Sequence, residues 1–117
     1  MVINQGDLYW VDLGEPIGSE PGFRRPFVIV QNDAFNRSKI NTVVVCALST
    51  NLKLSQAPGN VLLKKGEANL PKASVVNISQ VMTLDKEDLG TKIGQLSKKR
   101  MEEVIGGFQF LLKPRIL

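Results

Sequence analysis

The chain has 117 residues, of which 43% are hydrophobic and 22% charged, and its formal net charge is +4. A chain of this length builds one core more readily than two, so we expect a single domain over residues 1–117. The composition excludes wholesale disorder, collagen-like and coiled-coil proteins.

The first predicted strand covers residues 7–13, where polar and apolar side chains alternate as they do in a half-buried strand. A loop containing Gly18, Pro21 and Gly22 then leads directly into the next apolar run. These glycine and proline residues predict a turn of defined conformation that brings charged side chains to the end of a strand. Loops on a rigid sheet often carry function, so the loop is the first place to look for a site.

Two nearly continuous β-branched runs follow, at residues 26–32 and 42–49. They are typical of strands that are buried on both faces. The polar residues 32–38 between them predict a turn or a single helical turn. Shorter strand patterns occur at 60–64, 74–78, 80–84 and 91–96, separated by turn residues. Short strands separated by loops with turn residues predict a mainly β fold, either a barrel or a strongly twisted sheet.

The C-terminal segment changes to a helical period and begins at Ser97, a favourable N-cap residue. Its apolar stripe consists of Met101, Val104, Ile105, Phe108, Leu111 and Leu112. We interpret this stripe as a core face in preference to a partner face. Gly106 and Gly107 together cost a helix about 2 kcal/mol relative to two alanines, so we expect close packing to compensate. Pro114 is expected to end the helix.

Charge and the rarer residues narrow the choice of chemistry. The positive net charge favours a polyanion such as RNA, although a solvated basic surface explains it equally well. Cys46 is the single cysteine and the chain has no histidine, which excludes an intrachain disulfide and a histidine-activated thiol. Cys46 lies in an apolar run and is expected to be buried. Without a signal-peptide pattern or a membrane-length apolar stretch, we expect a cytoplasmic protein.

Several short motifs occur in a distinctive order along the chain. They are Gly6-Asp7-Leu8-Tyr9-Trp10-Val11-Asp12-Leu13, Gly18-Ser19-Glu20, Arg25-Pro26, Val28-Ile29-Val30-Gln31-Asn32, Leu48-Ser49-Thr50-Asn51, and Gln80 followed by Thr83 and Asp85. This series resembles the MazF/PemK/Kid family of toxins, which are metal-independent endoribonucleases of toxin–antitoxin pairs. The resemblance extends over nearly the whole chain.

The resemblance implies a compact SH3-like β barrel with a long C-terminal helix, assembled as a homodimer and needing no cofactor or metal. It implies a MazE-like antitoxin as partner, with an acidic and partly disordered segment. It also implies cleavage of single-stranded RNA by attack of a ribose 2′-OH, which gives a 2′,3′-cyclic phosphate (or 3′-phosphate) and a 5′-OH.

Metal-independent cleavage requires removal of the 2′-OH proton, stabilisation of the phosphorane and protonation of the leaving oxygen. Arg25 presents a rigid fork of donors that matches two phosphate oxygens, and the resemblance implies that it is the central catalytic residue. Its high pKa favours an electrostatic clamp over a base. Ser49 matches the family's active-site threonine and Thr50 the serine that follows. Neighbouring strand residues face opposite ways, so either hydroxyl could act, and position favours Ser49.

The resemblance assigns weaker roles to five further residues. Glu20 could orient the catalytic arginine or accept a proton, and Ser19 could contact RNA or shape the loop. Phe23 could stack an unpaired base or pack on the barrel, and Arg24 could bind phosphate or remain solvated. Gln80 matches a glutamine that touches RNA bases in relatives.

The alternative interpretation is a noncatalytic toxin like CcdB, or a nucleic-acid or protein-binding module of the same fold. An arginine at position 25 together with a hydroxyl at position 49 argues against it.

Overall fold

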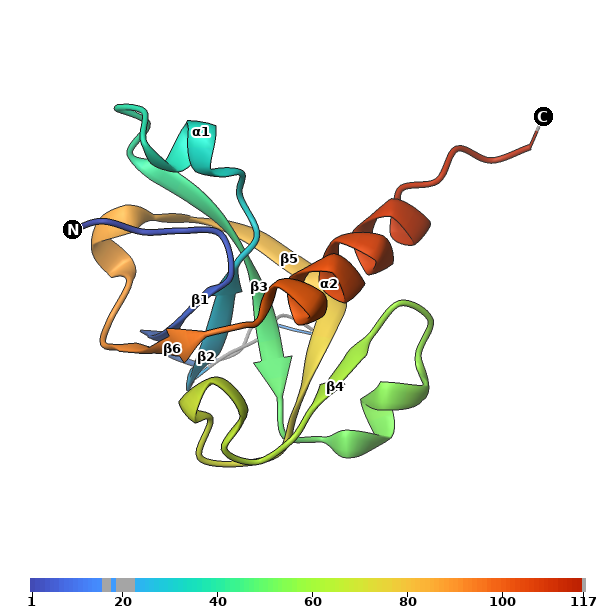
Figure 1. Cartoon of the computed structure of the whole chain (residues 1–117). Coiled ribbons are helices and arrows are strands. Elements are labelled where there is room, and N and C mark those ends of the chain that lie inside the picture. The colour runs from blue at the N-terminus through green and yellow to red at the C-terminus, as the bar shows by residue number, and fades with distance from the viewer. Residues whose placement is uncertain (16–17, 19–22, 117) are drawn as a thin grey trace.

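The computed structural model describes residues 1–15, 18 and 23–116. In this part of the chain, antiparallel strands form one curled sheet in the order β4-β5-β3-β2-β1-β6, with helix α2 lying across it (Figure 1). The strands are β1 (Asp7–Asp12), β2 (Arg24–Ile29), β3 (Thr42–Ser49), β4 (Val61–Leu63), β5 (Ser74–Asp85) and β6 (Lys92–Gln95). The helices are α1 (Asp33–Asn36), α2 (Lys98–Leu111) and the short 3₁₀ segments η1 (Leu52–Gln56), η2 (Glu67–Asn69) and η3 (Lys86–Asp88). The predicted mainly β fold with a C-terminal helix is confirmed.

The central strands β2 and β3 are buried on both faces, as their β-branched runs predict. Val28 and Cys46 belong to the core beneath α2, whereas Phe27 and Val45 belong to a second core on the opposite face of the sheet. This division follows from the alternation of side chains along a strand. Burial raises the pKa of the Cys46 thiol to about 12, so this cysteine packs as a small hydrophobic residue.

Strand β5 runs without interruption where two separate strands were predicted. Its pairing with β3 changes register between Cys46 and Leu48, where residues 77–80 of β5 lie opposite the single residue Ala47. The polar residues in this stretch therefore form an irregularity within one strand instead of a turn between two.

Helix α2 begins as predicted, because the Ser97 hydroxyl oxygen accepts a hydrogen bond from the Arg100 amide at 3.1 Å. Met101 and Val104 are buried in the core. Leu111 and Leu112 are 46% and 75% exposed, so the predicted core role is wrong for the end of the stripe. The end of the helix projects beyond the sheet (Figure 1). Among the helices described, none has both the length and the apolar character needed to cross a bilayer.

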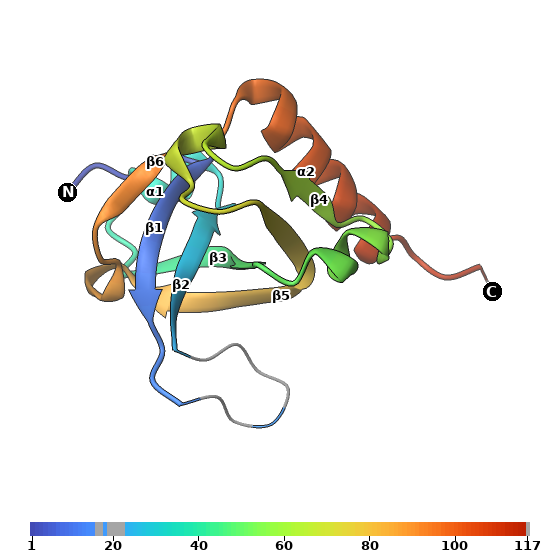
Figure 2. The ribbon, with the colours of Figure 1, turned by 90° about the horizontal axis from the view of Figure 1, so that it is seen from below.

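The adjacent helix glycines have different surroundings. Gly107 is buried against Gly59 in the turn before β4, and a Cβ atom on Gly107 would overlap the Gly59 carbonyl oxygen. A Cβ on Gly106 would meet open space. The predicted compensation by close packing therefore applies to Gly107 and not to Gly106. Figure 2 shows α2 running beside β4, where this contact is made.

Candidate active site

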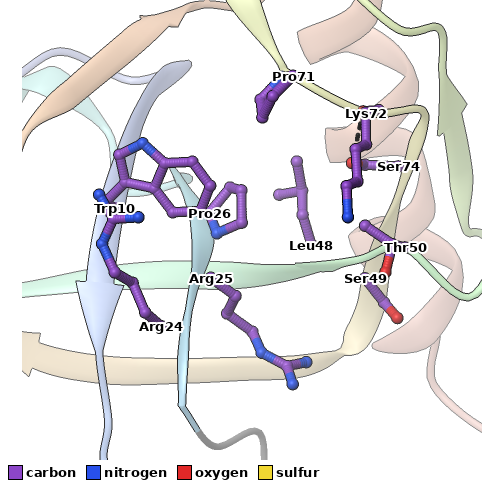
Figure 3. Close-up of a pocket in the computed structure, with 10 residues that line it drawn as sticks. All are labelled: Trp10, Arg24, Arg25, Pro26, Leu48, Ser49, Thr50, Pro71, Lys72 and Ser74. Atoms are coloured by element: carbon purple, nitrogen blue, oxygen red, sulfur yellow. Dashed lines mark hydrogen bonds between the residues drawn. The ribbon is translucent and has the colours of Figure 1, made fainter.

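A cavity of ≈ 290 Å³ lies where β1 and β3 end and β2 begins. Its lining residues are Trp10, Arg24, Arg25, Pro26, Leu48, Ser49, Thr50, Pro71, Lys72 and Ser74 (Figure 3). Three of these side chains are cationic and three carry hydroxyls, and the described lining contains no carboxylate. Such a lining suits a phosphate group, which accepts hydrogen bonds from both kinds of donor.

Strand register places the candidate catalytic residues on one face of the sheet. In the β2–β3 ladder, Phe27 pairs with Ala47. Continuing that antiparallel register by two residues brings Arg25 opposite Ser49. Thr50, the next residue along, then belongs to the other face. Figure 3 shows the same division, with Ser49 on the side of Arg25. This geometry favours Ser49 over Thr50 as the hydroxyl that acts with Arg25.

The Ser49 hydroxyl also has a local structural role. Its oxygen accepts a hydrogen bond from the Asn51 amide at 3.1 Å, and the Asn51 side chain in turn caps η1. An oxygen that accepts this bond still carries its own proton, so Ser49 remains able to donate to a substrate oxygen. The side chain is half-buried, and the turn that follows fixes its position at the end of β3.

Arg24 and Trp10 form a pair at the edge of the cavity. The guanidinium carbon lies 4.1 Å from the centroid of the indole ring, a cation–π contact. Trp10 pairs with Pro26 across the β1–β2 ladder, and Arg24 is its diagonal neighbour on the same face. Trp10 is not among the site residues predicted from the sequence. Strand alternation places Trp10 on the same face as buried Leu8 but nearer the end of the strand, and this pattern could have marked Trp10 as a residue at the edge of a site.

The remaining predicted site residues lie elsewhere or cannot be placed. Ser19 and Glu20 fall outside the described residues. Phe23 has a positive φ of 59° and is 59% exposed, but it does not line the cavity. Gln80 lies on β5 within the register shift and does not line the cavity either. The structure thus brings together Arg24, Arg25 and the Ser49–Thr50 pair.

Comparison with known proteins decides the family. Residues 4–112 match the family model described as the PemK-like, MazF-like toxin of type II toxin–antitoxin systems. The chain belongs to the PemK/MazF toxin family. It is 40% identical to endoribonuclease MazF6 of Mycobacterium tuberculosis, over 96% of this chain and 98% of that one. It is also 40% identical to endoribonuclease MazF of Staphylococcus saprophyticus, over 88% and 85%.

Solved structures agree with this assignment. A mycobacterial endoribonuclease in complex with its cognate antitoxin is 25% identical, with a TM-score of 0.74 and coverage of 99% of this chain and 98% of that one. MazF from Deinococcus radiodurans has the same fold, with a TM-score of 0.78 over 97% and 99%. The expected family, the toxin class and the endoribonuclease class are confirmed.

In this PemK/MazF toxin, one wall of the cavity comes from the loop before β5, in which no site residue was predicted. Pro71 and Lys72 line the cavity from this loop, and Ser74 lines it from the start of β5. The Ser74 hydroxyl donates a hydrogen bond to the Lys72 carbonyl oxygen at 3.0 Å. The Ser74 side chain is buried at the start of β5. Because a buried side chain has a fixed position, this hydrogen bond holds the Lys72 backbone at the rim of the cavity.

The same loop is attached to α2 by an ion pair. The Arg100 guanidinium donates to both carboxylate oxygens of Glu67, at 2.6 and 3.1 Å, and also to Glu103 at 3.0 Å. The hydrogen bond from Arg100 is the main cause that lowers the pKa of the Glu67 carboxyl below its usual value. The bidentate geometry fixes η2 relative to the helix. Among the described residues, no group of three or more His, Cys, Asp or Glu side chains is placed to share a metal ion.

Proposed function

We propose that this toxin cleaves single-stranded RNA at Arg25 and Ser49, without a metal, by attack of a ribose 2′-OH on the adjacent phosphorus. The bond from phosphorus to the 5′ oxygen breaks, which leaves a 2′,3′-cyclic phosphate and a 5′-OH. The observation that carries the proposal is the cavity itself, in which the cations Arg24, Arg25 and Lys72 gather with the hydroxyls of Ser49 and Thr50. The endoribonuclease relatives support it.

Each catalytic role follows from donor chemistry. The Arg25 fork binds two nonbridging oxygens and holds them more strongly as negative charge builds on the phosphorane. The Ser49 hydroxyl donates to a nonbridging oxygen from the facing strand. Glu20 is proposed to orient Arg25 or to accept the 2′-OH proton.

The remaining contacts are proposed to hold the RNA chain. Arg24 and Thr50 lie at the cavity and offer donors to the phosphate backbone. Ser19 and Gln80 are proposed to contact RNA, and the exposed ring of Phe23 offers a surface for an unpaired base. Base contacts select sequence, whereas phosphate contacts only position the strand.

The deciding experiment incubates the purified protein with a long single-stranded RNA in excess EDTA and maps the new ends. We expect discrete cuts with 5′-OH ends. In the same assay Ser49→Ala is expected to lose more activity than Thr50→Ala, because only Ser49 shares a face with Arg25. Intact RNA would reject the proposal and favour a noncatalytic binding toxin, and a larger loss in Thr50→Ala would reverse the assignment of the hydroxyls.

The family and the solved complex support three proposals about organisation. We propose that residues 1–117 act as one toxin domain, which predicts a single cooperative unfolding transition. We also propose a homodimer, for which light scattering should give twice the mass of one chain. An antitoxin of the MazE type is proposed to bind through an acidic segment, because one relative of known structure is an endoribonuclease in complex with its cognate antitoxin.

Charge-driven binding of such an antitoxin should weaken as salt rises, and a salt-insensitive complex would contradict it.

A toxin that acts on cellular RNA is proposed to work in the cytoplasm, which cell fractionation would test.

A further inference from the structure

The cavity has a second half on the face of the strand ends opposite Arg25 and Ser49. Thr50 and Trp10 belong to this half, and Figure 3 shows the Lys72 side chain entering it, with its ammonium group directed toward the strand end. Pro26 and Leu48 line the space between them. A cation, a hydroxyl and an aromatic ring therefore face a partly apolar surface.

The backbone that carries Lys72 is held from several sides. Glu67 is clamped by Arg100, and the Asn69 side chain donates to the Ile93 carbonyl oxygen at 3.2 Å. Ser74 holds the Lys72 carbonyl, as described above. These contacts join the loop to α2, β6 and β5, so the fold sets the position of the Lys72 backbone at the rim of the cavity.

Lys72 is also available to a ligand. The described ion pairs use Arg37, Lys92 and Arg100 as cations, and Lys72 takes part in none of them. Its side chain is exposed at the rim. A lysine ammonium group is a compact point charge on a flexible side chain, whereas an arginine guanidinium is a rigid planar fork. Lys72 is therefore better suited to binding a phosphate than to stabilising a transition state of defined shape.

We propose that Lys72, together with Thr50, binds the RNA phosphate that neighbours the scissile phosphate. The RNA strand passes around the ends of β2 and β3, with the scissile phosphate at Arg25 and Ser49 and its neighbour on the opposite face. The base between them lies against Trp10, whose ring already contacts Arg24. This inference rests on the proposed ribonuclease function and adds a subsite to it.

The test compares Lys72→Gln, Lys72→Arg and the control Lys99→Gln, which removes the same charge from an exposed position on α2 outside the cavity. Cleavage kinetics are measured on a short RNA containing one mapped site. Binding is measured across a salt series with the same RNA carrying a 2′-deoxy ribose at the cut, which cannot react.

A flanking contact is made equally in the ground and transition states, so its loss raises KM and leaves kcat unchanged. We expect Lys72→Gln to raise KM on the order of tenfold. The slope of log K against log salt should become less steep by about 0.7, the value for one phosphate contact on a single strand. Lys72→Arg should retain the wild-type KM and slope, and Lys99→Gln should match wild type.

Two results would overturn the proposal. If Lys72→Gln behaves like Lys99→Gln in KM and slope, Lys72 does not contact the RNA. If kcat falls while KM holds, Lys72 acts on the reacting phosphate and not on its neighbour. Failure of the ribonuclease function is distinguishable, because wild-type protein would then cut no RNA at all.

Discussion

Arg25→Ala is expected to lower kcat/KM for RNA cleavage by about 10²–10³-fold, the usual cost of removing a preorganised donor from a developing oxyanion. Arg25 is half-buried at the start of β2 and lines the cavity together with Ser49. Its two parallel donors match two phosphate oxygens, which an ammonium group cannot reproduce. Arg25→Lys should therefore recover only part of the lost rate.

The measurement is a single-turnover time course on one RNA of mapped cut site, so that binding and chemistry are separated. Arg115→Ala is the matched control, because Arg115 is an exposed arginine near the C-terminus and does not line the cavity. Circular dichroism checks that each variant is folded. An Arg25→Ala protein that cuts as fast as wild type would remove Arg25 from the mechanism.

Gly107→Ala is expected to destabilise the protein by about 1–3 kcal/mol, the typical cost of overpacking. The added methyl would overlap the Gly59 carbonyl oxygen and lie 3.0 Å from Ile78 Cγ1. The helix and the turn before β4 would have to separate. Gly106→Ala is expected to stabilise the protein by about 0.5–1 kcal/mol, because its methyl meets open space and alanine favours the helix.

Urea denaturation of both variants gives the comparison directly, because each changes one glycine to alanine in the same helix. Opposite signs of the change in unfolding free energy would support the packing described here. A Gly107→Ala protein at least as stable as wild type would show that α2 does not approach the turn so closely.

Much of this fold could be predicted because its strands carry strong local patterns. The β-branched runs specified β2 and β3, and the capping residue Ser97 specified the start of α2. Strand β5 was misjudged because the polar residue Ser79 separates the strand patterns 74–78 and 80–84, whereas pairing with β3 joins both into one strand. Leu112 was misjudged because helical periodicity does not reveal where the sheet beneath a helix ends.

The site was predicted in part for a similar reason. Arg25 and Ser49 lie in short motifs at the start of β2 and the end of β3, and the resemblance of these motifs to the family made both residues candidates. The choice between Ser49 and Thr50 needed the β2–β3 register, which a single strand does not contain. Lys72 lines the cavity from a connection that Arg100 holds through Glu67, and such long-range contacts leave no local signal in the sequence.

The most direct test of the proposed chemistry replaces the single ribose on the 5′ side of a mapped cut with 2′-deoxyribose and repeats the digestion in EDTA. Attack by the 2′-OH predicts that this cut disappears while neighbouring sites are still cleaved, and that the all-ribose control yields a 2′,3′-cyclic phosphate and a 5′-OH. Cleavage at the deoxy position would contradict this mechanism, because the nucleophile would then have to be a group other than the 2′-OH.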